Sequence, residues 1–164
     1  MKVIFLDIDD VLNSEQTAHA FHAEFGGNGF GGFFDSTLEE PTHRKVLWGQ
    51  DLVDNLKFIV DNTGAAIVVS STWRLSHSPQ AIQQMLRLYG LEAEVIDRTL
   101  RMFGPRGEEI DQWLNAHPEV DAYVILDDST DMLASQLGNF VQTDDYVGLT
   151  RVDAVKAVEI LNRA

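Results

Sequence analysis

Short apolar segments rich in β-branched residues recur along this chain, and they constrain its fold more than any other feature. The four clearest are Val3–Leu6, Ala65–Val69, Ala93–Ile96 and Tyr123–Leu126. None of them alternates polar with apolar residues, which is typical of strands buried on both faces of a parallel sheet. A weaker segment, Asn139–Gln142, predicts a fifth strand.

Helical patterns lie between these segments. The first covers about Gln50–Asn62 and is closed by Gly64. Ser78–Pro79 is a cap and first-turn pair for a second helix, which Gly90 ends. The apolar residues within 110–114 mark a third helix.

Thr150 caps a last helix, for which the spacing predicts a buried stripe of Val152, Val155, Val158 and Leu161. Strands that alternate with helices predict an α/β fold, with a mainly parallel sheet of about five strands flanked by helices. We expect residues 1–164 to form a single domain, because 164 residues can bury one sizeable core.

One segment, Ser14–Trp48, interrupts this alternation. It contains seven consecutive residues, 26–32, of which five are glycine, and it is too long for a simple connection. We expect a flap or small cap that either closes over a base or packs its own cluster of aromatic side chains. Those side chains are Phe21, Phe25, Phe30, Phe33 and Phe34.

The overall composition excludes several functional classes. The chain has no cysteine, so it has neither disulfides nor thiolate metal sites, and a bound metal must be held by oxygen or histidine. No apolar run approaches the roughly 18 residues that span a membrane, and the run before Asp7 is too short for a secretory signal. We therefore expect a cytoplasmic protein that does not bind membranes. The formal charge of −14 argues against binding to extended duplex nucleic acid.

Polar clusters follow three of the predicted strands. Asp7 and Asp9 follow the first, Ser70 the second, and Asp127 and Asp128 the fourth. Each alone is also typical of a turn or a helix cap. Ligands of open α/β sheets bind beyond the carboxyl ends of the strands, so together these residues predict a site there. If the fourth strand lies beside the first, the carboxylates converge and repel one another, which implies a cation such as Mg²⁺.

These motifs resemble those of the haloacid dehalogenase (HAD) superfamily of phosphohydrolases, which have a Rossmann-like fold. The matching positions, in order, are Asp7 to Val11, Ser70, Arg106 at the start of a helix, and Asp127 with Asp128. The segments 5–13, 69–74 and 106–114 look more narrowly like the HAD domains of RNA-repair proteins (Swiss Army Knife, polynucleotide phosphatase-like). One departure is Asp10, where that family usually has glycine. It puts the turn geometry and the metal affinity in question.

The resemblance implies a role for each matching residue. Asp7 is the implied nucleophile and Asp9 the general acid and base. Mg²⁺ is held by the Asp7 carboxylate, the Asp9 carbonyl, and one or both of Asp127 and Asp128. Ser70, with Ser71 beyond it, binds the phosphoryl group, and Arg106 offsets its charge.

Four other residues leave alternatives open. Arg74 is either a second phosphate ligand or a surface arginine paired with a carboxylate, and Arg98 and Arg101 compete with Arg106 for the basic role. We prefer Arg106 because Gly-Pro precedes it and a helix follows it. Trp73 is expected in the core rather than as a platform for a base.

The reaction and the substrate remain expectations. We expect a Mg²⁺-dependent phosphomonoesterase that forms an aspartyl phosphate and acts on a nucleotide or a polynucleotide end. The alternatives are a phosphatase of a small metabolite, a sugar phosphomutase, and a catalytically silent binding module. The resemblance favours a polynucleotide end, whereas the net charge favours a small molecule. The sequence predicts no oligomeric state.

Overall fold

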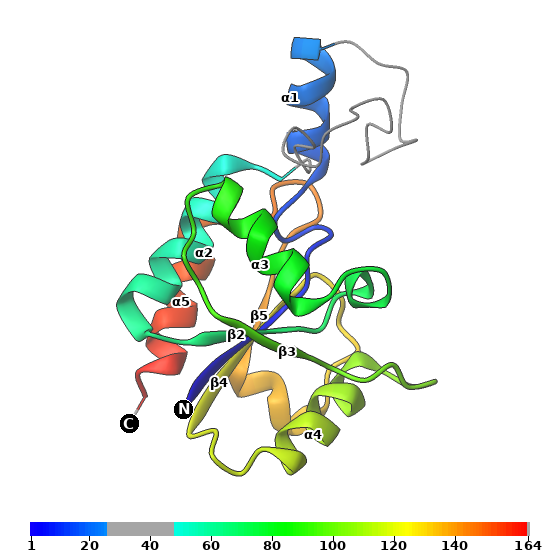
Figure 1. The fold of residues 1–164 in the computed structure, drawn as a ribbon, viewed down its shortest axis with the longest axis vertical. Coiled ribbons are helices and arrows are strands. Elements are labelled where there is room, and N and C mark those ends of the chain that lie inside the picture. Colours follow the sequence, from blue (N-terminus) through cyan, green and yellow to red (C-terminus); the bar gives the residue numbers. More distant parts are fainter. Residues whose placement is uncertain (26–47, 164) are drawn as a thin grey trace.

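The computed structural model describes residues 1–25 and 48–163. Within these residues, five strands form one parallel sheet in the order β3-β2-β1-β4-β5 (Figure 1). The strands are β1 (Lys2–Leu6), β2 (Ala66–Val69), β3 (Val95–Arg98), β4 (Ala122–Asp127) and β5 (Phe140–Gln142). The predicted α/β class and the parallel sheet are therefore confirmed.

Four helices fall where the sequence predicts them, whereas α1 and the two 3₁₀ turns were not predicted. The helices are α1 (Glu15–Phe25), α2 (Gln50–Thr63), α3 (Pro79–Leu88), α4 (Arg106–Ala116) and α5 (Arg151–Leu161), with the 3₁₀ turns η2 (Thr72–Leu75) and η3 (Ala134–Asn139). Gly64 ends α2 in the left-handed conformation with φ 66°, and the Ser78 hydroxyl caps α3. The Thr150 hydroxyl caps α5 by accepting a hydrogen bond from the Asp153 N–H.

The helices cover the sheet on both faces, which explains why its strands are apolar throughout. Alternate residues of β1 point to opposite faces. Ile4 and Leu6 belong to the core cluster shared with α2, α3 and α5, whereas Val3 and Phe5 pack against α4. On the α4 side, the Phe5 ring meets the Trp113 ring edge to face, with centroids 5.3 Å apart.

Two local predictions were wrong. The third strand was expected at Ala93–Ile96 but runs from Val95 to Arg98, with Asp97 and Arg98 paired to β2. β3 forms an edge of the sheet, so its backbone can pair while half of its side chains stay in solvent. An apolar run is therefore a poor guide to its bounds.

The predicted buried stripe of α5 was also displaced. Val152 and Val155 are exposed, at 78% and 42% of their reference areas. Leu161 is buried as predicted and Val158 is half-buried, but the other buried residues of the helix are Ala154, Ala157 and Ile160. Both stripes have helical spacing, but the two alanines let α5 approach its neighbours closely, whereas valines on that face would hold it away.

The predicted flap is only partly described. α1 occupies its first part, and the remainder, 26–47, lies outside the described residues, as do the side chains of all five phenylalanines. None of the described helices combines the length and apolar character needed to cross a membrane.

Candidate active site

Three aspartates from the tips of two neighbouring strands meet at the carboxyl edge of the sheet. Asp7 directly follows β1, and Asp127 is the last residue of β4. Leu6 pairs with Leu126 in the parallel register, so the two tips end level with each other. One carboxylate oxygen from each of Asp7, Asp127 and Asp128 lies within 4.8 Å of the other two.

The electrostatics of this cluster fit a hard cation. Burial raises the pKa of the Asp7 carboxyl. Burial and the nearby Asp7 charge raise the pKa of Asp127 to about 7. Carboxylates held this close without a counter-charge repel each other, and an all-oxygen donor set matches the preference of Mg²⁺. The residues present therefore fit the metal that the sequence predicts.

Arg106 supplies the positive charge already present beside these aspartates. Its Nη1 lies 2.8 Å from Asp127 Oδ2 and 3.3 Å from Asp7 Oδ1. The side chain comes from the first residue of α4. This helix precedes β4 in the chain, but its first turn lies beside the loop that follows β4. In that loop, the Asp131 carboxylate accepts a hydrogen bond of 2.9 Å from the Arg106 backbone N–H.

Gly107 lets α4 begin against the loop after β4. A Cβ at this position would lie 2.5 Å from the backbone nitrogen of Leu133 and 3.0 Å from the carbonyl carbon of Met132. The Gly107 N–H donates to the Asp131 carbonyl, and the Gly107 carbonyl accepts from the Gln136 side chain. Because Gly107 has no side chain, the first turn of α4 can lie against this loop, and this position places Arg106 next to the aspartates.

The turn after β1 holds Asp9 in place. The indole N–H of Trp73, on η2, lies 3.1 Å from both carboxylate oxygens of Asp9. The side-chain amide of Asn13 donates a second hydrogen bond of 3.0 Å to the same carboxylate. Trp73 is buried, as predicted for a core residue, but it also orients a predicted catalytic side chain.

Asp10 adopts the backbone conformation that its position requires. Its φ is +59°, in the left-handed region that glycine enters without steric cost. The Asn13 side chain accepts the Asp10 N–H, and the Thr143 hydroxyl donates to the Asp10 carbonyl. Burial and the neighbouring carboxylates, with Asp128 first among them, raise the pKa of Asp10 to about 6. The turn is therefore kept despite the side chain.

The two serines after β2 have different environments. A hydrogen bond from the Ser71 side chain lowers the pKa of Asp7 in opposition to burial, and the Ser71 hydroxyl accepts the Trp73 N–H. The Ser70 hydroxyl is fully buried and has no hydrogen-bond partner among the described residues. Ser71 is thus the serine whose hydroxyl contacts the Asp7 carboxylate.

Arg74 is buried rather than on the surface. Its Nη1 donates to the carbonyls of Ser70 and Ser71 at 2.5 and 2.7 Å, and its Nη2 forms an ion pair of 2.5 Å with Glu109 of α4. The other Glu109 oxygen accepts the Met102 N–H at 2.8 Å. Arg74 and Glu109 therefore tie the serine loop, α4 and the segment before α4 together.

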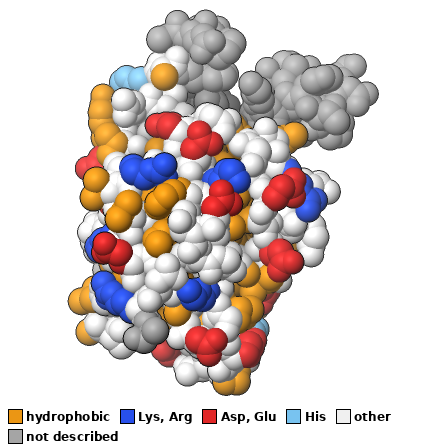
Figure 2. All heavy atoms as spheres, turned by 90° about the vertical axis from the view of Figure 1, so that its left-hand side faces the viewer, with side chains coloured by type: hydrophobic (Ala, Val, Ile, Leu, Met, Phe, Trp, Pro, Cys, Tyr) orange, Lys and Arg blue, Asp and Glu red, His pale blue; other side chains and the backbone are white. Residues whose placement is uncertain are grey.

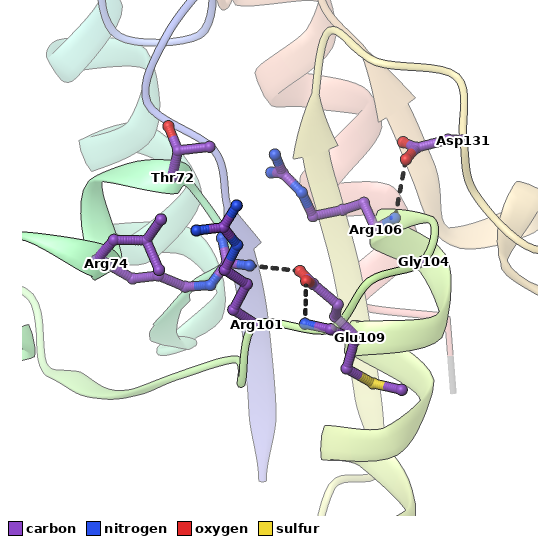
Figure 3. Close-up of a pocket in the computed structure, with 9 residues that line it drawn as sticks. Thr72, Arg74, Arg101, Gly104, Arg106, Glu109 and Asp131 are labelled. Atoms are coloured by element: carbon purple, nitrogen blue, oxygen red, sulfur yellow. Dashed lines mark hydrogen bonds and ion pairs between the residues drawn. The ribbon is translucent and has the colours of Figure 1, made fainter.

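A pocket of about 190 Å³ opens beside these residues (Figure 3). Thr72, Arg101 and Arg106 line it, together with Arg74 and Glu109. Figure 3 shows the side chain of Arg106 reaching from α4 toward the side of the pocket formed by Thr72 and Arg101. The pocket therefore adjoins the guanidinium that contacts Asp7 and Asp127.

A comparison with protein families decides the classification. The model of the HAD domain in Swiss Army Knife RNA repair proteins matches residues 3–154. The chain belongs to this HAD family. Among curated proteins and solved structures, none matches the chain significantly. HAD domains are phosphatase-type hydrolases in general, which is consistent with the acidic cluster.

The HAD domain brings most of the residues predicted for its site to one edge of the sheet. Asp7, Asp127 and Asp128 converge, and of the three competing arginines it is Arg106 that contacts them. Arg98 instead donates to the carbonyls of Arg74 and His77. Arg101 lines the pocket without touching the aspartates.

Several residues of this HAD domain support the site but were not predicted to do so. They are Asn13, Trp73, Gly107, Glu109 and Asp131. The sequence did contain a signal for Glu109, because this residue lies beside Ile110 and four residues before Trp113, on the apolar face of its helix. A charged residue on such a face needs a buried partner. The others act through turns and backbone contacts for which the sequence carries no periodic signal.

Proposed function

We propose that this HAD domain is a Mg²⁺-dependent phosphomonoester hydrolase that works through an aspartyl phosphate on Asp7. The observation that carries the proposal is the convergence of Asp7, Asp127 and Asp128 beside the guanidinium of Arg106. A buried carboxylate next to two others and one arginine suits attack on a phosphoryl group better than it suits a structural role, because the repulsion destabilises the fold without a ligand.

The first half-reaction transfers the phosphoryl group to the protein. An Asp7 carboxylate oxygen attacks phosphorus, and the bond between phosphorus and the leaving oxygen breaks. Asp9 gives its proton to that oxygen, so the leaving group departs as a neutral alcohol. The contacts from Trp73 and Asn13 support this role because they hold the Asp9 carboxyl in one orientation.

The second half-reaction returns Asp7 to its starting state. Asp9, now ionised, takes a proton from a water molecule whose oxygen attacks the phosphorus of the aspartyl phosphate. The bond from phosphorus to the Asp7 oxygen breaks, and inorganic phosphate leaves. Each residue thus ends the cycle in the protonation state in which it began.

Mg²⁺ would be held by Asp7, Asp127 and Asp128, together with the Asp9 carbonyl that the family resemblance implies. When bound, it neutralises phosphoryl oxygens and so lowers the repulsion between the phosphate and a carboxylate nucleophile. Arg106 adds a second positive charge from the protein itself.

The three remaining predicted phosphate ligands, Ser70, Ser71 and Arg74, do not all take the same role. Ser71 is the better candidate for a hydroxyl contact to the phosphoryl group, because its side chain already hydrogen-bonds Asp7. The buried Ser70 hydroxyl has no partner and stays a candidate for the same role. Arg74 is assigned a positioning role, because its guanidinium is engaged by Glu109 and by the serine carbonyls.

A nucleotide or a polynucleotide end is the proposed substrate. The family name refers to RNA repair, and a phosphate at a chain end can enter the site without an extended basic surface. On the face shown in Figure 2, acidic and basic side chains are interspersed without a continuous basic patch. A small phosphorylated metabolite is the alternative substrate.

Hydrolysis of p-nitrophenyl phosphate with and without Mg²⁺ tests the proposed reaction. We expect turnover that EDTA abolishes and Mg²⁺ restores, and that the Asp7→Asn variant lacks. Asp121→Asn is a matched control, because the Asp121 carboxylate is exposed and, within the described residues, contacts the terminal amine of Met1 and not the site. Undiminished turnover in Asp7→Asn rejects Asp7 as the nucleophile.

A further inference from the structure

The segment between β3 and α4, residues 99–105, carries an unusual set of exposed side chains. Leu100 is 68% exposed, Met102 is 36% exposed, and Phe103 is fully exposed. Arg101 stands between them and is also exposed. Large apolar side chains held this far into solvent are typical of an interaction site.

This segment is held in place rather than free to fold back. The Thr99 N–H at its start donates to the Val69 carbonyl of β2 at 3.0 Å. In its middle, the Met102 N–H donates to Glu109, which is itself fixed by the buried ion pair with Arg74 (Figure 3). The exposed side chains are therefore presented from an ordered backbone next to the site.

Arg101 is placed to meet a second anion. It lines the same pocket as Arg106, which contacts Asp7 and Asp127. Arg101 has no hydrogen bond or ion pair within the described residues, although the chain has more than twice as many acidic as basic side chains. An arginine without a carboxylate in such a chain is available to a phosphate.

The combination of an arginine and an exposed aromatic ring points to one kind of ligand. Single-stranded nucleic acid is bound by cationic side chains along its phosphates and by aromatic rings that stack on its bases. Arg101 and Phe103 are two residues apart, beside the pocket that leads to Asp7. A mononucleotide that places its only phosphate on Asp7 has no second phosphate for Arg101.

We propose that residues 99–105 bind the nucleotide next to the reacting phosphate, with Arg101 on the neighbouring phosphodiester and Phe103 stacked on a base. The substrate is then the phosphorylated end of a single-stranded nucleic acid. This inference rests on the proposed phosphatase function and narrows its substrate from phosphomonoesters in general to oligonucleotide ends.

The test compares kcat/KM for phosphorylated oligonucleotides with kcat/KM for p-nitrophenyl phosphate, which has neither a base nor a second phosphate. RNA and DNA trinucleotides phosphorylated at the 3′ or the 5′ end form the four arms, and nucleoside monophosphates form a fifth. We expect at least one trinucleotide to be preferred over its mononucleotide by about tenfold or more, as one stacking contact implies.

Variants then assign the preference to the segment. Arg101→Ala and Phe103→Ala should each lower the ratio of oligonucleotide to p-nitrophenyl phosphate kcat/KM by about fivefold or more. Phe103→Tyr should retain most of the ratio, because its ring still stacks. Lys156→Ala and Val152→Ala, at exposed positions of α5, are the matched controls and should leave the ratio unchanged.

The salt dependence of kcat/KM distinguishes the loss of a phosphate contact from a general distortion of the segment. For the preferred trinucleotide, log(kcat/KM) should fall with log[salt], and Arg101→Ala should make the slope shallower by about 0.7, the value for one contact to a single strand. Phe103→Ala should leave that slope as it is.

Each failure has its own meaning. If the wild type hydrolyses no substrate at all, the proposed function fails. If it hydrolyses p-nitrophenyl phosphate but the two alanine variants keep the wild-type ratio, this inference is overturned, and the exposed segment is left to a protein partner. An equal loss on both kinds of substrate also overturns it, because the residues would then act on the reacting phosphoryl group.

Discussion

The indole N–H of Trp73 lies 3.1 Å from each carboxylate oxygen of Asp9. Trp73 belongs to η2, which follows β2, whereas Asp9 belongs to the turn after β1. The hydrogen bond therefore joins the loops of two neighbouring strands at the site. It fixes the orientation of the residue to which we assign proton transfer.

Trp73→Phe should lower kcat for p-nitrophenyl phosphate by about tenfold, because a positioned acid and base contributes about 10² to 10⁴ and the substitution leaves only Asn13 to orient it. KM should change less, since no phosphate contact is removed. Steady-state kinetics of the wild type and of the Trp73→Phe variant measure kcat and KM.

Trp48→Phe is the control for this substitution. Trp48 packs on Trp73 with ring centroids 5.8 Å apart, but its indole nitrogen has no hydrogen-bond partner in the described part of the chain. The two variants lose the same atoms from one cluster. If both lower kcat equally, packing and not the hydrogen bond to Asp9 is responsible.

The stability of the metal-free protein should depend on pH through Asp127. Burial and the Asp7 charge raise its pKa from 3.8 to about 7 in the folded state. The folded protein thus binds this proton more tightly than the unfolded chain does, so the resulting stability is present below pH 3.8 and is lost as the pH rises through 7. Thermal melting in EDTA between pH 4 and 8 should show this decline.

Mg²⁺ should reverse the loss at pH 8. At a concentration about 100 times its Kd, an ion that binds only the folded state stabilises it by about 2.7 kcal/mol. Asp127→Asn should show both a shallower decline with pH and no stabilisation by Mg²⁺, whereas the surface variant Asp61→Asn should keep both. A wild-type Mg²⁺ shift in Asp127→Asn removes Asp127 from the metal site.

Asp10→Ala and Asp10→Gly both remove the same charge but differ in backbone strain. Because φ is +59°, alanine should be less stable than glycine at this position by about 1 kcal/mol. Chemical denaturation of the two variants measures the difference. Equal stability would mean that the turn relaxes out of the left-handed conformation when the side chain changes.

Gly107→Ala should destabilise the protein by about 1–3 kcal/mol, because its Cβ would meet backbone atoms of Leu133 and Met132 that cannot move independently. Activity should fall as well, since the first turn of α4 carries Arg106. Gly138→Ala is the control, because a Cβ there meets nothing within 4 Å. A fully stable Gly107→Ala would show that α4 can start elsewhere.

The sequence was sufficient for the parts of this molecule that depend on periodicity and chain direction. Runs of apolar residues located the inner strands, and the acidic residues at their ends predicted that Asp7 and Asp127 would meet. That prediction needed only a parallel sheet with β4 beside β1, which the structure confirms.

The parts that the sequence did not predict depend on contacts between segments. An exposed stripe and a buried stripe of α5 have the same spacing, so Val155 and Ala157 could not be told apart. Likewise, nothing in the residues around Ser70 and Ser71 decides which hydroxyl faces Asp7, because that depends on how the chain turns after β2.

The central place of β1 has a consequence for how the protein acquires its activity. Its two neighbours, β2 and β4, are remote along the chain, since Lys2 pairs with Ala122 and Val3 with Ala66. Contacts between such distant segments slow folding, because the intervening chain must be ordered first. Asp7 therefore gains Arg106 and Asp127 as neighbours only after the long stretch of chain that separates it from them has been synthesised and ordered.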